Sequence, residues 1–118
     1  MKLDLHCHTH FSDGTESLEW VLARAEENEV SHLAITDHDH LTPITDAASE
    51  RVTLIPGVEL SASWSNIEVH IVGLFVDHQS EALRSLVASK QSARFDRMQA
   101  MAEKLDKLGV EGLLEYLD

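Results

Sequence analysis

The feature that most constrains this chain is a short N-terminal segment in which two histidines alternate with other residues. Residues 4–8 read Asp-Leu-His-Cys-His, and alternate side chains of a strand share one face. Asp4, His6 and His8 are therefore expected on one face and Cys7 on the other. Two imidazoles on a stiff strand can hold one metal ion with little ordering cost. The segment favours a metal-binding strand over the alternative, a histidine-rich strand that binds nothing.

The apolar pattern of the first half predicts a β-α-β unit. Strands are expected at 2–8 and at 32–36. Ser17 is a good N-cap for an amphipathic helix running to about residue 28, because serine favours the position before the first helical turn. A strand, a helix and a second strand in such close succession are typical of a parallel pair joined by a crossover helix. The predicted fold class is therefore α/β.

The middle of the chain is predicted to leave this parallel pattern. A third strand is expected at 52–55, halted at Pro56-Gly57, with 58–60 continuing in extended form. Residues 65–66 (Ser-Asn) are typical of a turn, and 67–76 form a run rich in β-branched residues. Two strands joined by so short a turn pair antiparallel.

The C-terminal part is predicted to be mostly helical. Apolar residues recur at helical spacing from about 80 to 108, and Gly109 is a plausible residue to end that helix. Two helical turns are possible at 44–50, after the break imposed by Pro43. A further short helix is expected at 112–117.

Composition bounds the class of protein. The 118 residues suffice for one domain, and the formal charge of −12 disfavours binding of duplex DNA, which requires basic residues. The negative net charge does not exclude a phosphate substrate, because bound divalent cations invert the local electrostatic field. The single cysteine, Cys7, excludes an internal disulfide and a multi-cysteine zinc site. No apolar run is long enough for a membrane span and no signal-peptide pattern is present, so the cytoplasm is the expected location.

Imidazole and carboxylate side chains gather where the predicted strands end. His6, His8, His38 and Glu59 lie at or just past such ends, and the Ser-Asp-Gly turn can bring Asp13 back over them. In α/β barrels these ends carry the chemistry. A donor set without thiolate suits Zn, Mn or Fe in hydrolytic sites, and the surplus of ligands suggests two or three ions, with Glu59 as a bridge. Such a cluster activates water.

The remaining polar residues have less specific interpretations. Asp37 and Asp39 flank His38 and are expected to support the ligands or the turn rather than bind metal. His70 lies in mid-strand, and two interpretations of it stay open: a core histidine whose hydrogen bonds are satisfied, or a metal ligand. Cys7 is predicted to be a small core residue, and Trp64 is a candidate for lining a substrate pocket. The histidines interpreted as ordinary polar or loop residues are His10, His32, His40 and His78.

Four segments, in order along the chain, resemble the motifs of a known superfamily. They are DLHCHT with SDG within 4–14, ITDHD at 35–39, PGVELS at 56–61 and HIVG at 70–73. Together they resemble the first motifs of the polymerase and histidinol phosphatase (PHP) superfamily. The stretch 64–77 and the helix after it look most like the bacterial branch of 3′,5′-nucleoside bisphosphate phosphatases and RNase AM.

This resemblance implies a distorted (β/α)7 barrel with a trinuclear Mn, Fe or Zn site, in which metal-bound hydroxide attacks phosphorus and no protein nucleophile is needed. The positions that match the family's ligands are His6, His8, Asp13, His38, Glu59 and His70. Members of the family run to more than twice this length, and their later motifs supply further ligands and basic substrate-binding residues. Residues 1–118 are therefore expected to be the N-terminal part of a single PHP domain, truncated on its C-terminal side.

The function that the resemblance implies is metal-dependent hydrolysis of nucleotide 3′,5′-bisphosphates or of short RNA 5′ ends. A histidinol-phosphatase-like enzyme is the alternative within enzymes, although the 64–77 stretch disfavours it. A non-catalytic, metal-binding PHP module is the alternative of a different class. The expected partner is a small nucleotide phosphate or short RNA, with neither duplex DNA nor a membrane.

Overall fold

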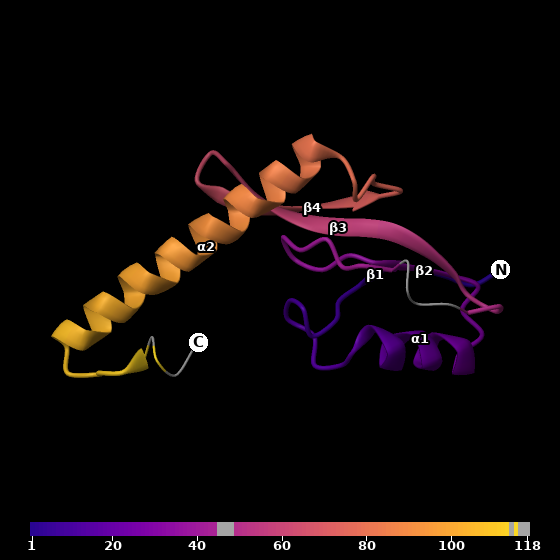
Figure 1. Cartoon of the computed structure of the whole chain (residues 1–118), viewed down its shortest axis with the longest axis horizontal. Helices are drawn as coiled ribbons and strands as arrows, with labels where there is room; N and C mark the ends of the chain where they lie inside the picture. Colours follow the sequence, from indigo (N-terminus) through magenta and orange to yellow (C-terminus); the bar gives the residue numbers. More distant parts are fainter. Residues whose placement is uncertain (45–48, 114, 116–118) are drawn as a thin grey trace.

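A four-stranded mixed sheet organises the computed structural model, which describes residues 1–44, 49–113 and 115 (Figure 1). The strands lie in the order β1-β2-β3-β4; β1 and β2 are parallel, β2 and β3 are parallel, and β3 and β4 are antiparallel. Their bounds are β1 Leu3–Cys7, β2 His32–Ile35, β3 Thr53–Trp64 and β4 Ile67–Leu74. The predicted β-α-β unit and the later change to antiparallel pairing are both confirmed.

Helix α1 (Leu18–Glu27) joins β1 to β2 and covers one face of the sheet. Its N-cap is Ser17, as predicted, and the serine side chain accepts a hydrogen bond from the Trp20 backbone N–H. The apolar positions of α1 pack against those of β2 and its neighbours because the 3.6-residue repeat puts them on one stripe. This core consists of Leu18, Leu22, Ala25, Val30, Leu33, Ile35 and Val52, with Cys7 partly buried against it.

Strand β3 does not stop at Pro56, so the predicted halt is wrong. Pro56 is the last residue of β3 in register with β2, where it pairs with Ile35, and Gly57 is the first in register with β4, where it pairs with Leu74. The proline therefore stands where the strand changes partner, which is a position that tolerates a missing N–H. Its carbonyl still accepts a hydrogen bond from the Val76 backbone N–H, 3.2 Å away.

A two-residue turn joins β3 to β4. Ser65 and Asn66 have φ values of 49° and 63°, and left-handed conformation at both central residues is the geometry that matches the twist of a tight hairpin. The predicted turn is confirmed. Strand β4 is the edge strand of the described sheet, and most of its residues are exposed, including Ile67 and Ile71.

Helix α2 (Glu81–Lys107) follows β4 and begins with Ser80 as N-cap, whose side chain accepts from the Leu83 backbone N–H. It ends at the predicted position, with Leu108 as C-cap and Gly109 next at a φ of 93°. Figure 1 shows its C-terminal half extending beyond the sheet, and the longest dimension of the molecule is 53 Å.

Two predicted short helices fall partly outside the described residues: residues 45–48 of the segment 44–50, and residues 114, 116 and 117 of the segment 112–117. In the part of the chain that the structure does describe, no helix combines the length and apolar character needed to cross a membrane.

Candidate metal centre

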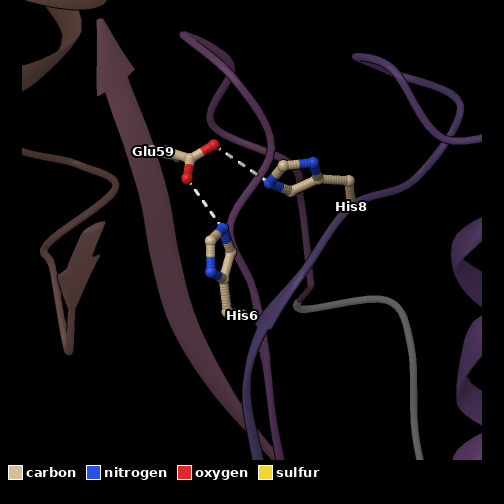
Figure 2. Close-up of side chains that lie close together, drawn as sticks. All are labelled: His6, His8 and Glu59. Atoms are coloured by element: carbon tan, nitrogen blue, oxygen red, sulfur yellow. Dashed lines mark ion pairs between the residues drawn. The ribbon is translucent and has the colours of Figure 1, made fainter. Parts of the chain in front are cut away.

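His6, His8 and Glu59 converge from two strands onto one point (Figure 2). His6 lies on β1, His8 follows its last residue, and Glu59 lies on β3. The Nε2 atom of His6 is 2.7 Å from Oε1 of Glu59, and the Nε2 atom of His8 is 3.1 Å from Oε2. One carboxylate therefore faces two imidazoles, one on each of its oxygens.

An irregularity in β1 helps to aim these imidazoles. Asp4 pairs with Leu33 and Cys7 with Ile35, so three steps along β1 correspond to two along β2. Extra residues of this kind bend a strand and re-aim its side chains, and they are common beside active sites. The regular alternation predicted for this segment is thus locally broken, although Cys7 still packs towards the core.

The loop after β1 folds back and brings Asp13 beside two imidazoles. Oδ1 of Asp13 is 2.6 Å from Nδ1 of His8, and Oδ2 is 3.3 Å from Nε2 of His38. The Thr9 carbonyl closes the loop by accepting the backbone N–H of Gly14 at 3.0 Å. A Cβ atom at Gly14 would come within 2.8 Å of two backbone oxygens, so this close turn requires glycine. The predicted return of Asp13 is confirmed.

His38 and His70 complete the cluster around Glu59. Nδ1 of His38 is 2.9 Å from Oε2 of Glu59, and the rings of His38 and His70 are 4.9 Å apart. Backbone bonds hold His38 beside β3, because Asp39 N–H donates to the Glu59 carbonyl and Glu59 N–H donates to the Asp37 carbonyl. His70 reaches the cluster from β4, across the hairpin.

All six residues predicted as ligands therefore lie in one cluster, which forms three overlapping groups of donor atoms, each within 4.8 Å: His6, His8 and Glu59; His8, Asp13 and His38; His38, Glu59 and His70. The predicted convergence is confirmed, and the third group brings His70 into it. Their role as metal ligands remains a prediction.

Burial shows that the cluster fits a cation. Glu59 is 3% exposed, and His8 Nε2, His38 Nδ1 and Glu59 Oε2 are buried without a hydrogen-bond partner. These atoms lie 2.9–3.1 Å apart, yet their orientations do not make hydrogen bonds. Buried polar atoms without partners are costly, and nitrogen and carboxylate oxygen are the donors that zinc and related cations accept. A cation would satisfy these atoms.

Asp13 carries negative charge in this setting. Burial opposes ionisation of its carboxyl, but the hydrogen bond with His8 and the charges of His8 and His38 outweigh it, so the pKa of Asp13 lies below its ordinary value.

Asp37 is the buried support of the loop that carries Asp13. Its carboxylate accepts the Thr9 backbone N–H at 2.7 Å, the Thr9 hydroxyl at 2.7 Å, the Ser12 hydroxyl at 2.6 Å and the Thr42 hydroxyl. Burial alone would raise the pKa of Asp37, but these donors lower it below the ordinary value. The supporting role predicted for Asp37 is confirmed.

Asp39 points away from the cluster towards α2. It forms an ion pair with Arg94, with 2.7 Å between Nε and Oδ2, and the Ser61 backbone N–H donates to Oδ1. The Gln91 side chain donates to the Asp39 carbonyl. Arg94 was not among the residues predicted for the site. The available signal was the helical spacing of Lys90, Arg94 and Arg97, which puts basic side chains on one face of α2.

A cavity of about 510 Å³ opens beside the cluster, within the range of roughly 300–1,000 Å³ typical of small-molecule sites. Cluster residues and side chains of α2 line it together: Phe11, Ser12, Asp13, His38, Asp39, His40, Glu68, His70, Gln91 and Arg94. Trp64 was a candidate for lining a substrate pocket, but it is not among these residues and is 71% exposed. It therefore does not line this cavity.

The other histidines lie outside the three donor groups. His40 stacks on Phe11 at 4.8 Å and contacts the Thr42 hydroxyl. His32 contacts the Ser31 hydroxyl, and His78 lies 3.4 Å from the Gly57 carbonyl.

Known proteins are similar to this chain in sequence. The 5′-3′ exoribonuclease Rnm of Escherichia coli (strain K12) is 42% identical over an alignment of 118 residues, which covers 95% of this chain and 40% of that protein. A 3′,5′-nucleoside bisphosphate phosphatase of Chromobacterium violaceum is 34% identical over 117 residues, covering 96% of this chain and 41% of that protein.

A solved structure of an amidohydrolase from Chromobacterium violaceum, with bound sulfate and no metal, matches with a TM-score of 0.82 at 35% identity and covers 95% of this chain and 41% of that one. The chain thus spans about 40% of the length of these relatives. Its half-barrel of mixed sheet and helices fits the predicted N-terminal part of a PHP barrel. A family model described as the PHP domain matches residues 4–115, and the chain belongs to this family.

Proposed function

We propose that this chain is the metal-binding part of a phosphoesterase that uses two or three divalent cations. The observation that carries the proposal is the set of three overlapping donor groups around a buried Glu59. Three buried donor atoms in this set lack hydrogen-bond partners. The proposed ligands are His6, His8, Asp13, His38, Glu59 and His70.

Each part of the cluster has a distinct task in this proposal. Glu59 faces His6 with one oxygen and His8 and His38 with the other, so its carboxylate is suited to bridge two cations. Asp13 links His8 to His38 and supplies negative charge to a second position. A bound Mn, Fe or Zn ion supplies Lewis acidity that activates water and offsets charge on a phosphate. No protein nucleophile is required.

The substrate that we propose is a nucleotide 3′,5′-bisphosphate or the 5′ end of a short RNA. The named activities of two relatives, a nucleoside bisphosphate phosphatase and a 5′-3′ exoribonuclease, support this class. The solved structure from Chromobacterium violaceum holds sulfate, a tetrahedral anion like phosphate. The cavity beside the cluster has Arg94 on its wall, and arginine binds phosphate oxygens through paired N–H donors. The net charge of −12 disfavours duplex DNA as a partner.

We also propose that residues 1–118 act within one PHP domain. The relatives are about two and a half times longer, and β4 exposes apolar side chains at the edge of the described sheet. Edge strands of this kind are normally covered.

The test is hydrolysis by purified protein loaded with manganese, in a 118-residue form and in a form extended to the length of the relatives. Adenosine 3′,5′-bisphosphate and a 5′-phosphorylated RNA trinucleotide serve as substrates. We expect metal-dependent turnover, which Glu59→Gln and His38→Ala abolish. His32→Ala is the matched control, because His32 lies at the start of β2 outside the donor groups. Metal binding without hydrolysis in both forms would instead identify a non-catalytic module.

A further inference from the structure

Asp39 occupies a strained and buried position immediately after His38. Its φ is 46°, in the left-handed region that costs a non-glycine residue about 1 kcal/mol or more. The residue is 1% exposed. Its backbone is held on both sides, because its N–H donates to the Glu59 carbonyl and its carbonyl accepts from Gln91. This conformation turns the carboxylate away from the donor groups and towards α2.

The buried carboxylate is paired with one guanidinium. Asp39 Oδ2 accepts from Arg94 Nε at 2.7 Å, and Oδ1 accepts from the Ser61 backbone N–H at 3.0 Å. Arg94 Nη2 also donates to the Ser61 hydroxyl at 2.8 Å. Asp39 and Ser61 thus hold the guanidinium at two of its edges, although 55 residues separate Asp39 from Arg94 in the sequence.

The guanidinium of Arg94 still has N–H donors available for a ligand. Arg94 has five N–H donors, and two of them are used within the described part of the chain. Its side chain is 43% exposed and lines the same cavity as His38 and His70. A free arginine side chain has rotamer entropy of about 2 kcal/mol to lose on binding a ligand. The two protein contacts remove part of that loss in advance.

We infer that Asp39 is a positioning residue that fixes Arg94 as a phosphate-binding donor at the mouth of this cavity. The inference rests on the proposed function, since it assigns the phosphate of the substrate to Arg94. Asp39 itself touches neither the phosphate nor the cations. It acts through the orientation of the guanidinium, and it links that orientation to the backbone that carries His38 and Glu59.

A double-mutant cycle on manganese-loaded protein tests this inference, with inorganic phosphate as the titrated probe in calorimetry and metal content measured separately. Charge-assisted hydrogen bonds are worth about 1.5–3 kcal/mol, or roughly 10–100-fold in affinity. We expect Arg94→Ala to weaken phosphate binding by about that factor and Asp39→Asn by about 10-fold. In the Arg94→Ala background, Asp39→Asn should add less than about twofold.

Ser61→Ala is a second variant that leaves the buried carboxylate intact, so it is useful if Asp39→Asn fails to fold. It should weaken phosphate binding by roughly three- to tenfold without changing manganese content. Arg84→Ala is the matched control, because Arg84 lies on the same helix but does not line this cavity.

The outcomes separate the inference from the function on which it rests. Wild-type protein that binds neither manganese nor phosphate would overturn both. Wild-type protein that binds both, combined with additive effects of Asp39→Asn and Arg94→Ala, would overturn the inference alone. The inference would also be overturned if Asp39→Asn lowered the manganese content as much as it lowered the affinity for phosphate. Asp39 would then support the metal ligands and not Arg94.

Discussion

Removal of the Asp37 carboxylate should destabilise the fold more than any surface substitution. Asp37 is fully buried and accepts four hydrogen bonds, from one backbone N–H and three hydroxyls. Asp37→Ala leaves all four donors without this partner, and we expect a loss of about 3–5 kcal/mol in the free energy of unfolding. Asp37→Asn keeps the shape and one acceptor oxygen, so its cost should be about 1–2 kcal/mol.

The dependence on pH has a definite sign. The pKa of Asp37 in the folded state is below its ordinary value, because its hydrogen-bond donors outweigh the effect of burial. Its contribution to stability is therefore complete above the unfolded-state pKa of about 4 and is lost as the pH falls through the folded-state value. The stability gap between wild type and Asp37→Asn should be constant from about pH 5 to 8 and should shrink below about pH 4.

Urea unfolding followed by far-ultraviolet circular dichroism, with EDTA present, measures these differences. Asp96→Ala, an exposed position on α2, is the control and should lie within about 0.5 kcal/mol of wild type. An Asp37→Ala variant as stable as this control would refute the role assigned to Asp37.

Three further results are expected. The pKa of the Cys7 thiol is raised to about 11 by burial and by the nearby Asp4 and Asp37 charges, so Ellman's reagent at pH 8 should react far more slowly with folded protein than with protein in urea; equal rates would contradict this. Gly14→Ala should weaken manganese binding in calorimetry, because the added Cβ would meet backbone oxygens 2.8 Å away, and unchanged affinity would count against a tight loop. Ser17→Ala should cost about 1 kcal/mol in urea unfolding through loss of the helix cap, whereas a neutral effect would mean that the cap is redundant.

Features that depend on neighbouring residues were predictable from the sequence. Ser17 caps α1 as predicted, α2 begins where the apolar pattern turns helical, and the Ser65-Asn66 turn sets the hairpin. The candidates at strand ends, His6, His8, His38 and Glu59, were predictable as well, because parallel strands bring their carboxyl ends to one edge, whereas His70 on antiparallel β4 was predicted only through the family resemblance. That rule places side chains from separate strands together without any knowledge of the loops.

Features that depend on a distant partner were not predictable. Pro56 looks like a strand end, and only the change of partner from β2 to β4 explains why the strand continues. The pairing of Asp39 with Arg94 spans 55 residues, and no local pattern distinguishes this arginine from the other basic residues of α2. The exposure of Trp64 was not predictable either, since its position after Glu59 in the sequence does not reveal that the strand carries it out to solvent.

The measurement that tests the metal centre most directly is diffraction from crystals grown with zinc, with data collected on both sides of the zinc absorption edge. We expect at least two anomalous peaks inside the cluster, roughly 3.5–4 Å apart. Each should lie about 2.0–2.2 Å from imidazole nitrogens or carboxylate oxygens, with Glu59 contacting both. Zinc peaks at His32 or His78 together with an empty cluster would contradict this expectation.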